Sequence, residues 1–247
     1  MIAYEVLRII DSKPLFALEH YQRLCNSILN NNRNIKLEYH SFILELKNLI
    51  DTNNFQLGNI KVEVVFDEVS TDYKVKAFII PHHYPSDYDY KNGVRLATYL
   101  YTRENPNLKI WNQNLRENID DLIKTQNVFE VVYVNKHNFL SEGSRSNLFF
   151  IADNKLISAK PEDILLGVTR KYIIEVAKPL GLELVEKDIP LAEIESYDSA
   201  FLSGTSPKVL PVRKINNIYF SSNNKYLRDL MTKFDERLNE DIRNFQF

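Results

Sequence analysis

The sequence predicts an α+β protein built from two halves, and three observations lead to that prediction. Strand-like runs of apolar residues occur along the whole chain, segments with helical periodicity lie between them, and one tract without apolar periodicity divides the series. With 247 residues and 44% hydrophobic content, the chain can bury a full core as one large domain or as two small ones. We therefore expect two packed halves, each combining helices with a sheet.

The first half is predicted to contain a strand, two helices and a pair of strands. The leucines and isoleucine of the first helix fall mostly on one face, which is the pattern of a helix packed on a core; they are Leu18, Leu24, Ile28 and Leu29. The turn after the first strand is marked by Asp, Ser and Pro. In chain order, the predicted segments are a strand at 4–10, a turn at 11–14, helices at 18–29 and 41–49, and paired strands at 61–66 and 74–80.

The tract 82–92 is the best linker candidate, because it is rich in Tyr and His rings and has no apolar periodicity. We accordingly expect a small α+β domain at 1–85, a linker at 86–92 and a larger domain at 93–247. The predicted segments of the larger domain are strands at 93–101, 128–134, around 139, 147–151, 155–158, 182–188 and 199–202, with helices at 112–124, after 167 and from 224 onward.

Composition excludes several classes of protein. The formal net charge is −2 and acids and bases are interspersed, so we expect neither a nucleic-acid partner nor a membrane surface. Cys25 is the only cysteine, which rules out an internal disulfide and fits a reducing compartment. The start shows no signal peptide, and no apolar stretch approaches the roughly 20 residues of a membrane span. We expect a cytoplasmic protein without a metal site.

Three separated motifs carry the chemistry, with Lys109 between them. They are His-Tyr-Gln-Arg-Leu at 20–24, Glu-Gly-Ser-Arg-Ser-Asn-Leu-Phe-Phe at 142–150 and Leu-Gly-Val-Thr-Arg at 166–170. An acid can pair with a ring nitrogen, Gly and Thr at a helix start can hold a phosphate, Arg can bind that phosphate, and Lys can form an imine. Together they supply what a pyridoxal phosphate (PLP) site needs.

The order and spacing of these motifs resemble class IV aminotransferases, the fold-type IV PLP enzymes that include branched-chain and D-amino acid aminotransferases and aminodeoxychorismate lyase. The resemblance runs from Tyr4-Glu5 to Pro211-Val212, nearly the whole chain. It implies a small N-terminal α/β sandwich, a larger α/β barrel-like domain that binds PLP, and a homodimer whose partner subunit helps close the site. Typical members carry another strand and loop before the Tyr-Glu position, whereas this chain begins almost directly there.

Lys109 is the residue that the resemblance implies for the imine with PLP. Family members carry an apolar-Lys-x-x-Asn element here, and Lys109 and Asn112 match it, whereas Gln113 replaces the aromatic or basic residue that often follows. An arbitrary lysine is usually a solvated surface residue, and Lys124 and Lys136 are the alternative candidates. Because Gln113 departs from the family pattern, the partner of the PLP phenolic oxygen stays open.

Glu142 is the expected partner of the pyridine nitrogen, because a carboxylate there keeps the ring protonated and makes it a better electron sink. The alternative is an ordinary hairpin turn at 141–144, although Glu-Gly-Ser-x-Ser-Asn before an apolar strand is more specific than Glu-Gly alone. We expect Asn147 to fix this loop through backbone groups.

The phosphate is expected to bind three segments. Gly167, Val168 and Thr169 precede or begin a helix whose free N–H groups suit an anion, although Thr169 could equally be a plain N-cap. The resemblance implies Thr205 and the Gly204 backbone as a second contact. It also implies Arg23 as a bidentate cation, with a solvated helix residue as the alternative. We expect His20 to pack or cap.

The resemblance thus implies transfer of an amino group between an amino acid and a 2-oxo acid. Aminodeoxychorismate lyase activity, which eliminates pyruvate, is the alternative within the fold, and a non-catalytic relic that binds a ligand is the alternative outside it. D-Amino acid transamination is less expected, because the turn at 66–72 is acidic where that branch has a basic loop. Candidate pocket residues are Tyr4, Tyr101 and Trp111.

Overall fold

The computed structural model describes residues 1–247 except 34, 68–71 and 83, and the chain divides into two compact units. Unit 1 comprises Met1–His83, Leu108–Trp111 and Leu238–Phe247. Unit 2 comprises Tyr84–Asn107 and Asn112–Arg237. Two short segments that are distant in sequence from the N-terminal half, one of which contains Lys109, therefore belong to unit 1. The centre of the acidic turn predicted at 66–72 lies outside the described residues.

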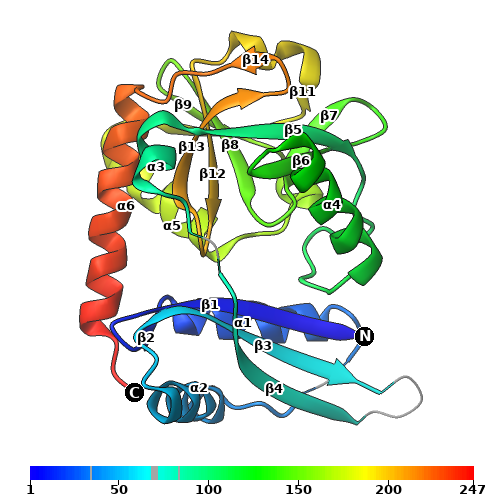
Figure 1. The fold of residues 1–247 in the computed structure, drawn as a ribbon, viewed down its shortest axis with the longest axis vertical. Coiled ribbons are helices and arrows are strands. Elements are labelled where there is room, and N and C mark those ends of the chain that lie inside the picture. Colours follow the sequence, from blue (N-terminus) through cyan, green and yellow to red (C-terminus); the bar gives the residue numbers. More distant parts are fainter. Residues whose placement is uncertain (34, 68–71, 83) are drawn as a thin grey trace. The chain divides into compact units, whose positions relative to one another are not determined.

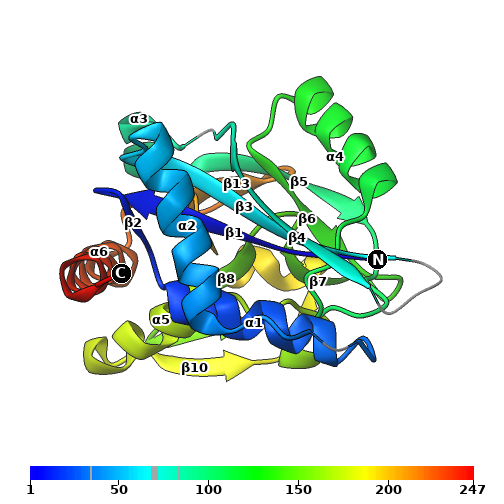
Figure 2. The same ribbon diagram turned by 90° about the horizontal axis from the view of Figure 1, so that it is seen from below.

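Unit 1 is an antiparallel sheet with two helices against one face (Figures 1 and 2). Its strands run in the order β2-β1-β3-β4, and its elements are β1 (Ile2–Ile10), β2 (Lys13–Pro14), α1 (Ala17–Leu29), α2 (Tyr39–Asn53), β3 (Leu57–Phe66) and β4 (Tyr73–Ile80). Because side chains alternate along a strand, Leu7 of β1 and Val62 of β3 share the core with Leu24 of α1 and Leu46 of α2. Tyr4 and Lys61 lie on the opposite face of the sheet and are also buried.

Unit 2 is a larger mixed sheet with helices packed around it (Figure 1). The strand order is β10-β9-β8-β12-β13-β5-β6-β7-β11, with β14 paired to β13. The strands are β5 (Val94–Leu100), β6 (Glu130–Val134), β7 (Phe139–Gly143), β8 (Asn147–Ala152), β9 (Lys155–Ser158), β10 (Glu183–Glu186), β11 (Ile189–Pro190), β12 (Ser199–Gly204), β13 (Lys208–Ile215) and β14 (Ile218–Tyr219). The helices are α3 (Asp87–Asn92), α4 (Gln113–Gln126), α5 (Val168–Ala177) and the part of α6 (Lys225–Asn244) up to Arg237, with short 3-10 turns at Pro161–Asp163, Lys178–Leu180 and Leu191–Ser196.

The core of unit 2 includes aromatic rings on both faces of the central strands. Phe149 of β8 and Phe201 of β12 stack with ring centres 5.1 Å apart, and Phe150 on the opposite face packs against Tyr197. These adjacent strands form an antiparallel pair, and α5 packs on β12. The loop that leads into β8 is therefore anchored to the most buried part of the unit.

Each segment predicted from periodicity corresponds to an element, with ends that differ by a few residues. The two-residue strands β2, β11 and β14 and the 3-10 turns were not predicted, and neither were two longer elements. The short helix α3 lies within the proposed linker tract and is held by a capping box, in which Ser86 and Asp89 bond each other's backbone N–H groups. The strand β13 was also missed, because Pro211 argues against a central strand.

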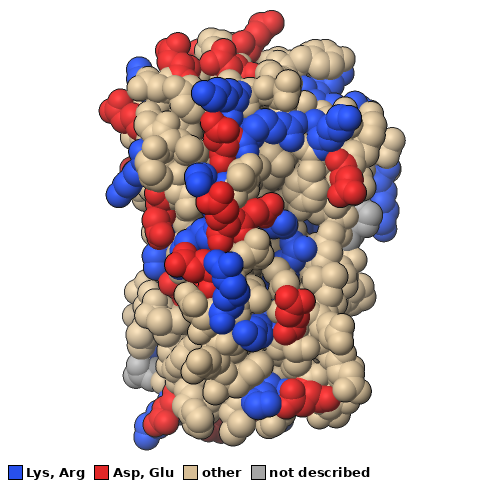
Figure 3. Space-filling view, turned by 90° about the vertical axis from the view of Figure 1, so that its left-hand side faces the viewer, with Lys and Arg blue, Asp and Glu red and all other residues tan. Residues whose placement is uncertain are grey.

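On the face of the molecule shown in Figure 3, basic side chains (Lys and Arg) are interspersed with acidic ones (Asp and Glu). Within the described ranges, no helix combines the length and the apolarity needed to cross a bilayer.

Candidate active site

Lys109 lies beside the first strand of unit 1, where its backbone is held on both sides. Its carbonyl accepts a hydrogen bond from the Tyr4 N–H at 3.2 Å, and its own N–H donates to the Ser27 hydroxyl of α1 at 3.3 Å. Ile110 continues the contact as an antiparallel bridge with Ala3. The Lys109 amine lies 4.7 Å from the centre of the Tyr4 ring. Backbone contacts therefore hold this segment independently of the Lys109 side chain.

Two of the three predicted pocket residues meet in unit 1. Tyr4 and Trp111 form an edge-to-face pair with ring centres 5.5 Å apart. A second amine joins them, because Nζ of Lys61 lies 3.7 Å from the Trp111 ring centre and 5.0 Å from that of Tyr4, and it pairs with Glu63 at 2.6 Å. Both amines thus lie within 5.0 Å of the Tyr4 ring centre, as suits cations over an aromatic face.

Sequence reasoning missed Lys61, which is 8% exposed. It was missed because strand alternation alone does not say whether the second face of a sheet is buried. The available signal was a lysine within a largely apolar strand. The third predicted pocket residue, Tyr101, belongs to unit 2, where its ring centre lies 5.0 Å from that of Tyr133.

Arg23 takes part in a buried ion network of unit 1. Its Nε and Nη2 donate to the two oxygens of Glu5, each at 2.7 Å, and Nδ1 of His20 lies 2.7 Å from Oε2 of Glu5. Glu5 is fully buried although it comes from β1, and Arg23 and His20 come from one face of α1. Glu5 thus occupies the Nε edge of the guanidinium, which the sequence analysis had not foreseen.

The charges of this network follow from its geometry. Burial by itself would raise the pKa of Glu5, but the Arg23 charge and the hydrogen bonds from Arg23 and His20 outweigh it and hold that pKa well below its usual range. Burial lowers the pKa of His20, against the opposing effect of Glu5. A neutral His20 beside an ionised Glu5 must carry its proton on Nδ1, which leaves Nε2 as an acceptor. His20 therefore packs and bonds internally, as expected.

Glu142 is the penultimate residue of β7 in unit 2 and is 2% exposed. Its Oε2 accepts hydrogen bonds from Nδ2 of Asn147 and from the Leu165 N–H, both at 3.1 Å. Nε of Arg103 lies 3.0 Å from Oε1. Asn147 also donates to the Leu165 carbonyl at 2.7 Å, so this amide fixes the loop through backbone groups as the sequence predicted. These contacts hold the Glu142 carboxylate in one orientation.

The predicted phosphate segments of unit 2 begin α5 and end β12. Gly167 is the N-cap of α5, so Thr169 is the second helical residue and does not cap the helix. A Cβ on Gly167 would lie 2.2 Å from Oδ1 of Asn147, which explains why a glycine stands there. At the end of β12, a Cβ on Gly204 would come within 3.2 Å of the Pro207 ring. Both glycines keep backbone close to neighbouring groups.

The predicted site residues divide between the two units. Unit 1 contains Tyr4, Arg23, Lys109 and Trp111, and unit 2 contains Tyr101, Glu142, Gly167, Val168, Thr169, Gly204 and Thr205. Within unit 2, Asn147 links the loop of Glu142 to the start of α5 through its contacts with Leu165 and Gly167.

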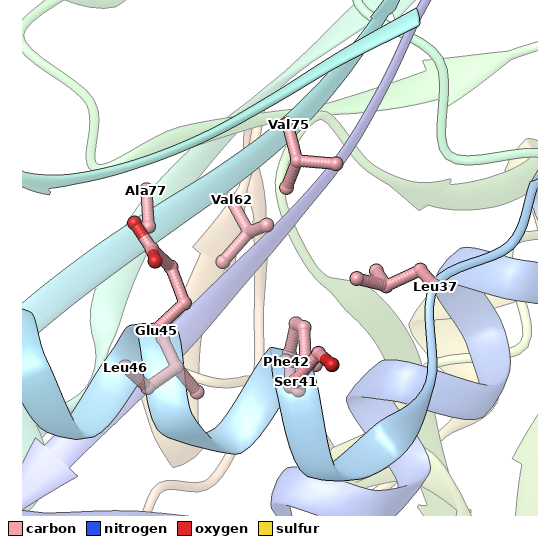
Figure 4. A pocket seen from close by; sticks show the side chains of 8 residues that line it. All are labelled: Leu37, Ser41, Phe42, Glu45, Leu46, Val62, Val75 and Ala77. Carbon is pink, nitrogen blue, oxygen red and sulfur yellow. The ribbon is translucent and has the colours of Figure 1, made fainter.

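A cavity of about 230 Å³ opens in unit 1 between α2 and the strands β3 and β4 (Figure 4). Its lining is apolar apart from Ser41 and Glu45, and consists of Leu37, Ser41, Phe42, Glu45, Leu46, Val62, Val75 and Ala77. These residues lie on the helix-covered face of the sheet, whereas Tyr4 and Lys61 lie on the other. The cavity is therefore separate from the candidate active site.

Comparison with known proteins finds a matching family model and similar sequences. The family model described as "Amino-transferase class IV" matches residues 2–215. A probable branched-chain-amino-acid aminotransferase of Thermotoga maritima is 29% identical over 228 residues, covering 88% of this chain and 78% of that protein. Against the branched-chain-amino-acid aminotransferase-like protein 2 of Arabidopsis thaliana, which is 27% identical, the match covers 86% of this chain but spans only 41% of the relative's length.

Solved structures show the same fold. A putative 4-amino-4-deoxychorismate lyase of Legionella pneumophila aligns with a TM-score of 0.86 at 24% identity, covering 97% of this chain and 91% of that one. A hypothetical aminotransferase of Mycobacterium tuberculosis in its PLP-bound form aligns with a TM-score of 0.82 at 16% identity, covering 97% of this chain and 89% of that one. The predicted fold class, with its smaller and larger α/β parts, is confirmed.

Proposed function

Because this chain belongs to the class IV aminotransferase family, as its sequence motifs had predicted, we propose that it transfers an amino group between an amino acid and a 2-oxo acid with PLP as cofactor. The candidate cofactor-binding residues are Lys109 and Arg23 in unit 1, and Glu142, Gly167, Val168, Thr169, Gly204 and Thr205 in unit 2.

The carboxylate of Glu142 carries the proposal. A buried anion is costly unless it is hydrogen-bonded and paired. Oε2 of Glu142 accepts from Asn147 and the Leu165 N–H, and Oε1 lies 3.0 Å from Nε of Arg103. A protonated ring nitrogen is a suitable cation for such a carboxylate. Glu142 would keep the proton on that nitrogen throughout the reaction.

The remaining donors also fit a phosphorylated aldehyde. The first N–H groups of α5 are not used within the helix, and Gly167 lets its start lie close to Asn147. Arg23 would meet the phosphate through the edge formed by its two terminal nitrogens, because Glu5 occupies the Nε edge. Glu5 thereby holds the guanidinium in one plane.

When bound, PLP supplies an aldehyde that carries the amino group and a ring that accepts the electrons released at the substrate α-carbon. Lys109 would attach the cofactor and, once released by the incoming substrate, use its amine to move a proton between the α-carbon and the cofactor. Lys61, which pairs with Glu63, brings a second amine beside the Tyr4 ring, and its remaining N–H donors suit the carboxylate shared by amino acids and 2-oxo acids.

The purified protein gives a direct test. A visible absorption band that borohydride bleaches supports a PLP enzyme, whereas a colourless protein that cannot be reconstituted with PLP supports the non-catalytic relic. Screening amino donors for release of the matching 2-oxo acid then tests amino-group transfer. Absence of transfer with every donor, in a protein that carries the band, would contradict the proposal.

Aminodeoxychorismate lyase activity is the second candidate function, and it is supported by the structural similarity to the putative lyase of Legionella pneumophila. The same screen separates the two, because a lyase releases pyruvate from aminodeoxychorismate without a 2-oxo acid acceptor. We further propose a cytoplasmic homodimer, supported by the single cysteine and by the family; sedimentation of the purified protein tests the dimer.

A further inference from the structure

Unit 2 contains a second buried carboxylate that the proposed reaction does not use. Glu130 begins β6 and is 3% exposed. Its Oε1 accepts the Arg145 N–H at 2.5 Å and the Ser144 hydroxyl at 3.3 Å, and its Oε2 accepts the Ser146 hydroxyl at 3.1 Å. Three donors from consecutive residues therefore converge on one side chain.

This convergence explains the sequence motif at 142–147. Ser144 and Ser146 do not point to a ligand in this arrangement, because both hydroxyls bond Glu130. Gly143 makes room for the same carboxylate, since a Cβ there would lie 2.5 Å from its Oε1 and 2.4 Å from Oγ of Ser146. The motif is thus a loop wrapped around Glu130.

The two ends of this loop are Glu142, the candidate partner of the ring nitrogen, and Asn147, which orients it. Glu142 precedes the wrapped segment and Asn147 follows it, and Nδ2 of Asn147 donates to Oε2 of Glu142. The Leu165 N–H completes the arrangement by donating to the same oxygen. A change in the path of residues 143–146 must therefore alter the direction of the Glu142 carboxylate.

We propose that Glu130 is the positioning residue for Glu142, which it acts on through the backbone and hydroxyls of Ser144, Arg145 and Ser146. The consequence for catalysis rests on the proposed function, because only there does Glu142 face a ring nitrogen. The geometric claim concerns the chain itself. A merely structural Glu130 would support stability without controlling the bonds of Glu142.

Hydrogen exchange separates these two roles in the protein as purified. The Leu165 amide bonds Glu142 and has no bond to Glu130, so its protection reports the position of Glu142. Glu130→Gln retains the side-chain size but replaces one acceptor oxygen by a donor, and Ser146→Ala removes one of the three donors. Either change should speed exchange at Leu165 by about fivefold to tenfold, the factor expected for one hydrogen bond.

Ser199→Ala is the matched control. Ser199 is a fully buried serine of the same unit, and its hydroxyl donates to the Ser221 carbonyl at 2.7 Å, away from the loop. It should lower the thermal midpoint about as much as Ser146→Ala while leaving exchange at Leu165 unchanged. Unchanged exchange at Leu165 in both Glu130→Gln and Ser146→Ala would overturn the proposal.

A second readout uses the loaded enzyme. Misdirecting Glu142 should lower kcat by about tenfold or more and change the pH dependence of the cofactor absorption band, while KM stays within about twofold, because no substrate contact is altered. Wild-type kcat and an unchanged band in Glu130→Gln would overturn the proposal. A wild-type protein that never binds PLP would overturn the proposed function instead, and the exchange measurement would still decide the role of Glu130.

Discussion

Glu5→Gln should destabilise unit 1 far more than the loss of an ordinary ion pair would. Glu5 is fully buried and accepts two hydrogen bonds from Arg23 and one from His20, each at 2.7 Å. A glutamine cannot accept all three donors, because its amide nitrogen would face one of them as a second donor. It also removes the charge that pairs with Arg23, whose side chain is 13% exposed. Breaking one partner of a buried pair costs about 3 to 5 kcal/mol.

For a chain of this size, that cost corresponds to a fall of roughly 6 to 20 °C in the thermal midpoint. Thermal unfolding followed by far-UV circular dichroism at neutral pH measures it. The control is Asp51→Asn, which removes an exposed pair with Lys47 in α2 and should cost only about 0.3 to 0.5 kcal/mol. Equal shifts in the two variants would contradict the larger contribution of the buried Glu5 network to stability.

The same variant has a defined pH dependence. The pKa of Glu5 in the folded protein lies below its usual value of 4.5, so its stabilisation is fully present above that value and is lost as the pH falls toward the folded pKa. The difference in midpoint between wild type and Glu5→Gln should therefore shrink on acidification below about pH 5. A constant difference down to strongly acidic pH would contradict the assigned network.

The remaining predictions concern the proposed cofactor site. Lys109→Ala should abolish the lysine-bound cofactor band and turnover but leave the circular dichroism spectrum unchanged, because the backbone of Lys109 makes the contacts to Tyr4 and Ser27; a retained band would remove the assignment. Glu142→Gln should still bind PLP but lose about a hundredfold in rate, on the order of 3 kcal/mol, and an unchanged kcat/KM would make Glu142 a turn residue. Arg23→Ala should weaken PLP binding, measured by titration of the apoprotein, more than Thr205→Ala does, and it should lose much of the competition by free phosphate; equal affinity in wild type and Arg23→Ala would exclude the phosphate contact.

Local periodicity was sufficient to predict most elements of this fold. The apolar stripe of α1 and the continuous apolar run of β8 are properties of a few adjacent residues, which is why their positions could be predicted. The strand β13 could not be predicted, because a proline argues against a central strand. In the structure, Pro211 is paired with β12, and the pairing of β13 with β5 is irregular next to it. The helix α3 depends on a two-residue capping box, which carries no apolar signal.

The candidate lysine, glutamate, arginine and glycines of the site could be identified from the sequence alone, because residue type and spacing are enough to recognise them. The sequence also determined the family, which the match over residues 2–215 shows. Only the tertiary structure decided the partners of those groups. It placed Lys109 beside β1 in unit 1, paired Arg23 with Glu5, added Lys61 beside Tyr4, and wrapped the Glu142 loop around Glu130. Each of these contacts joins residues from different elements, and their energies arise from burial, which a residue acquires only when those elements pack together.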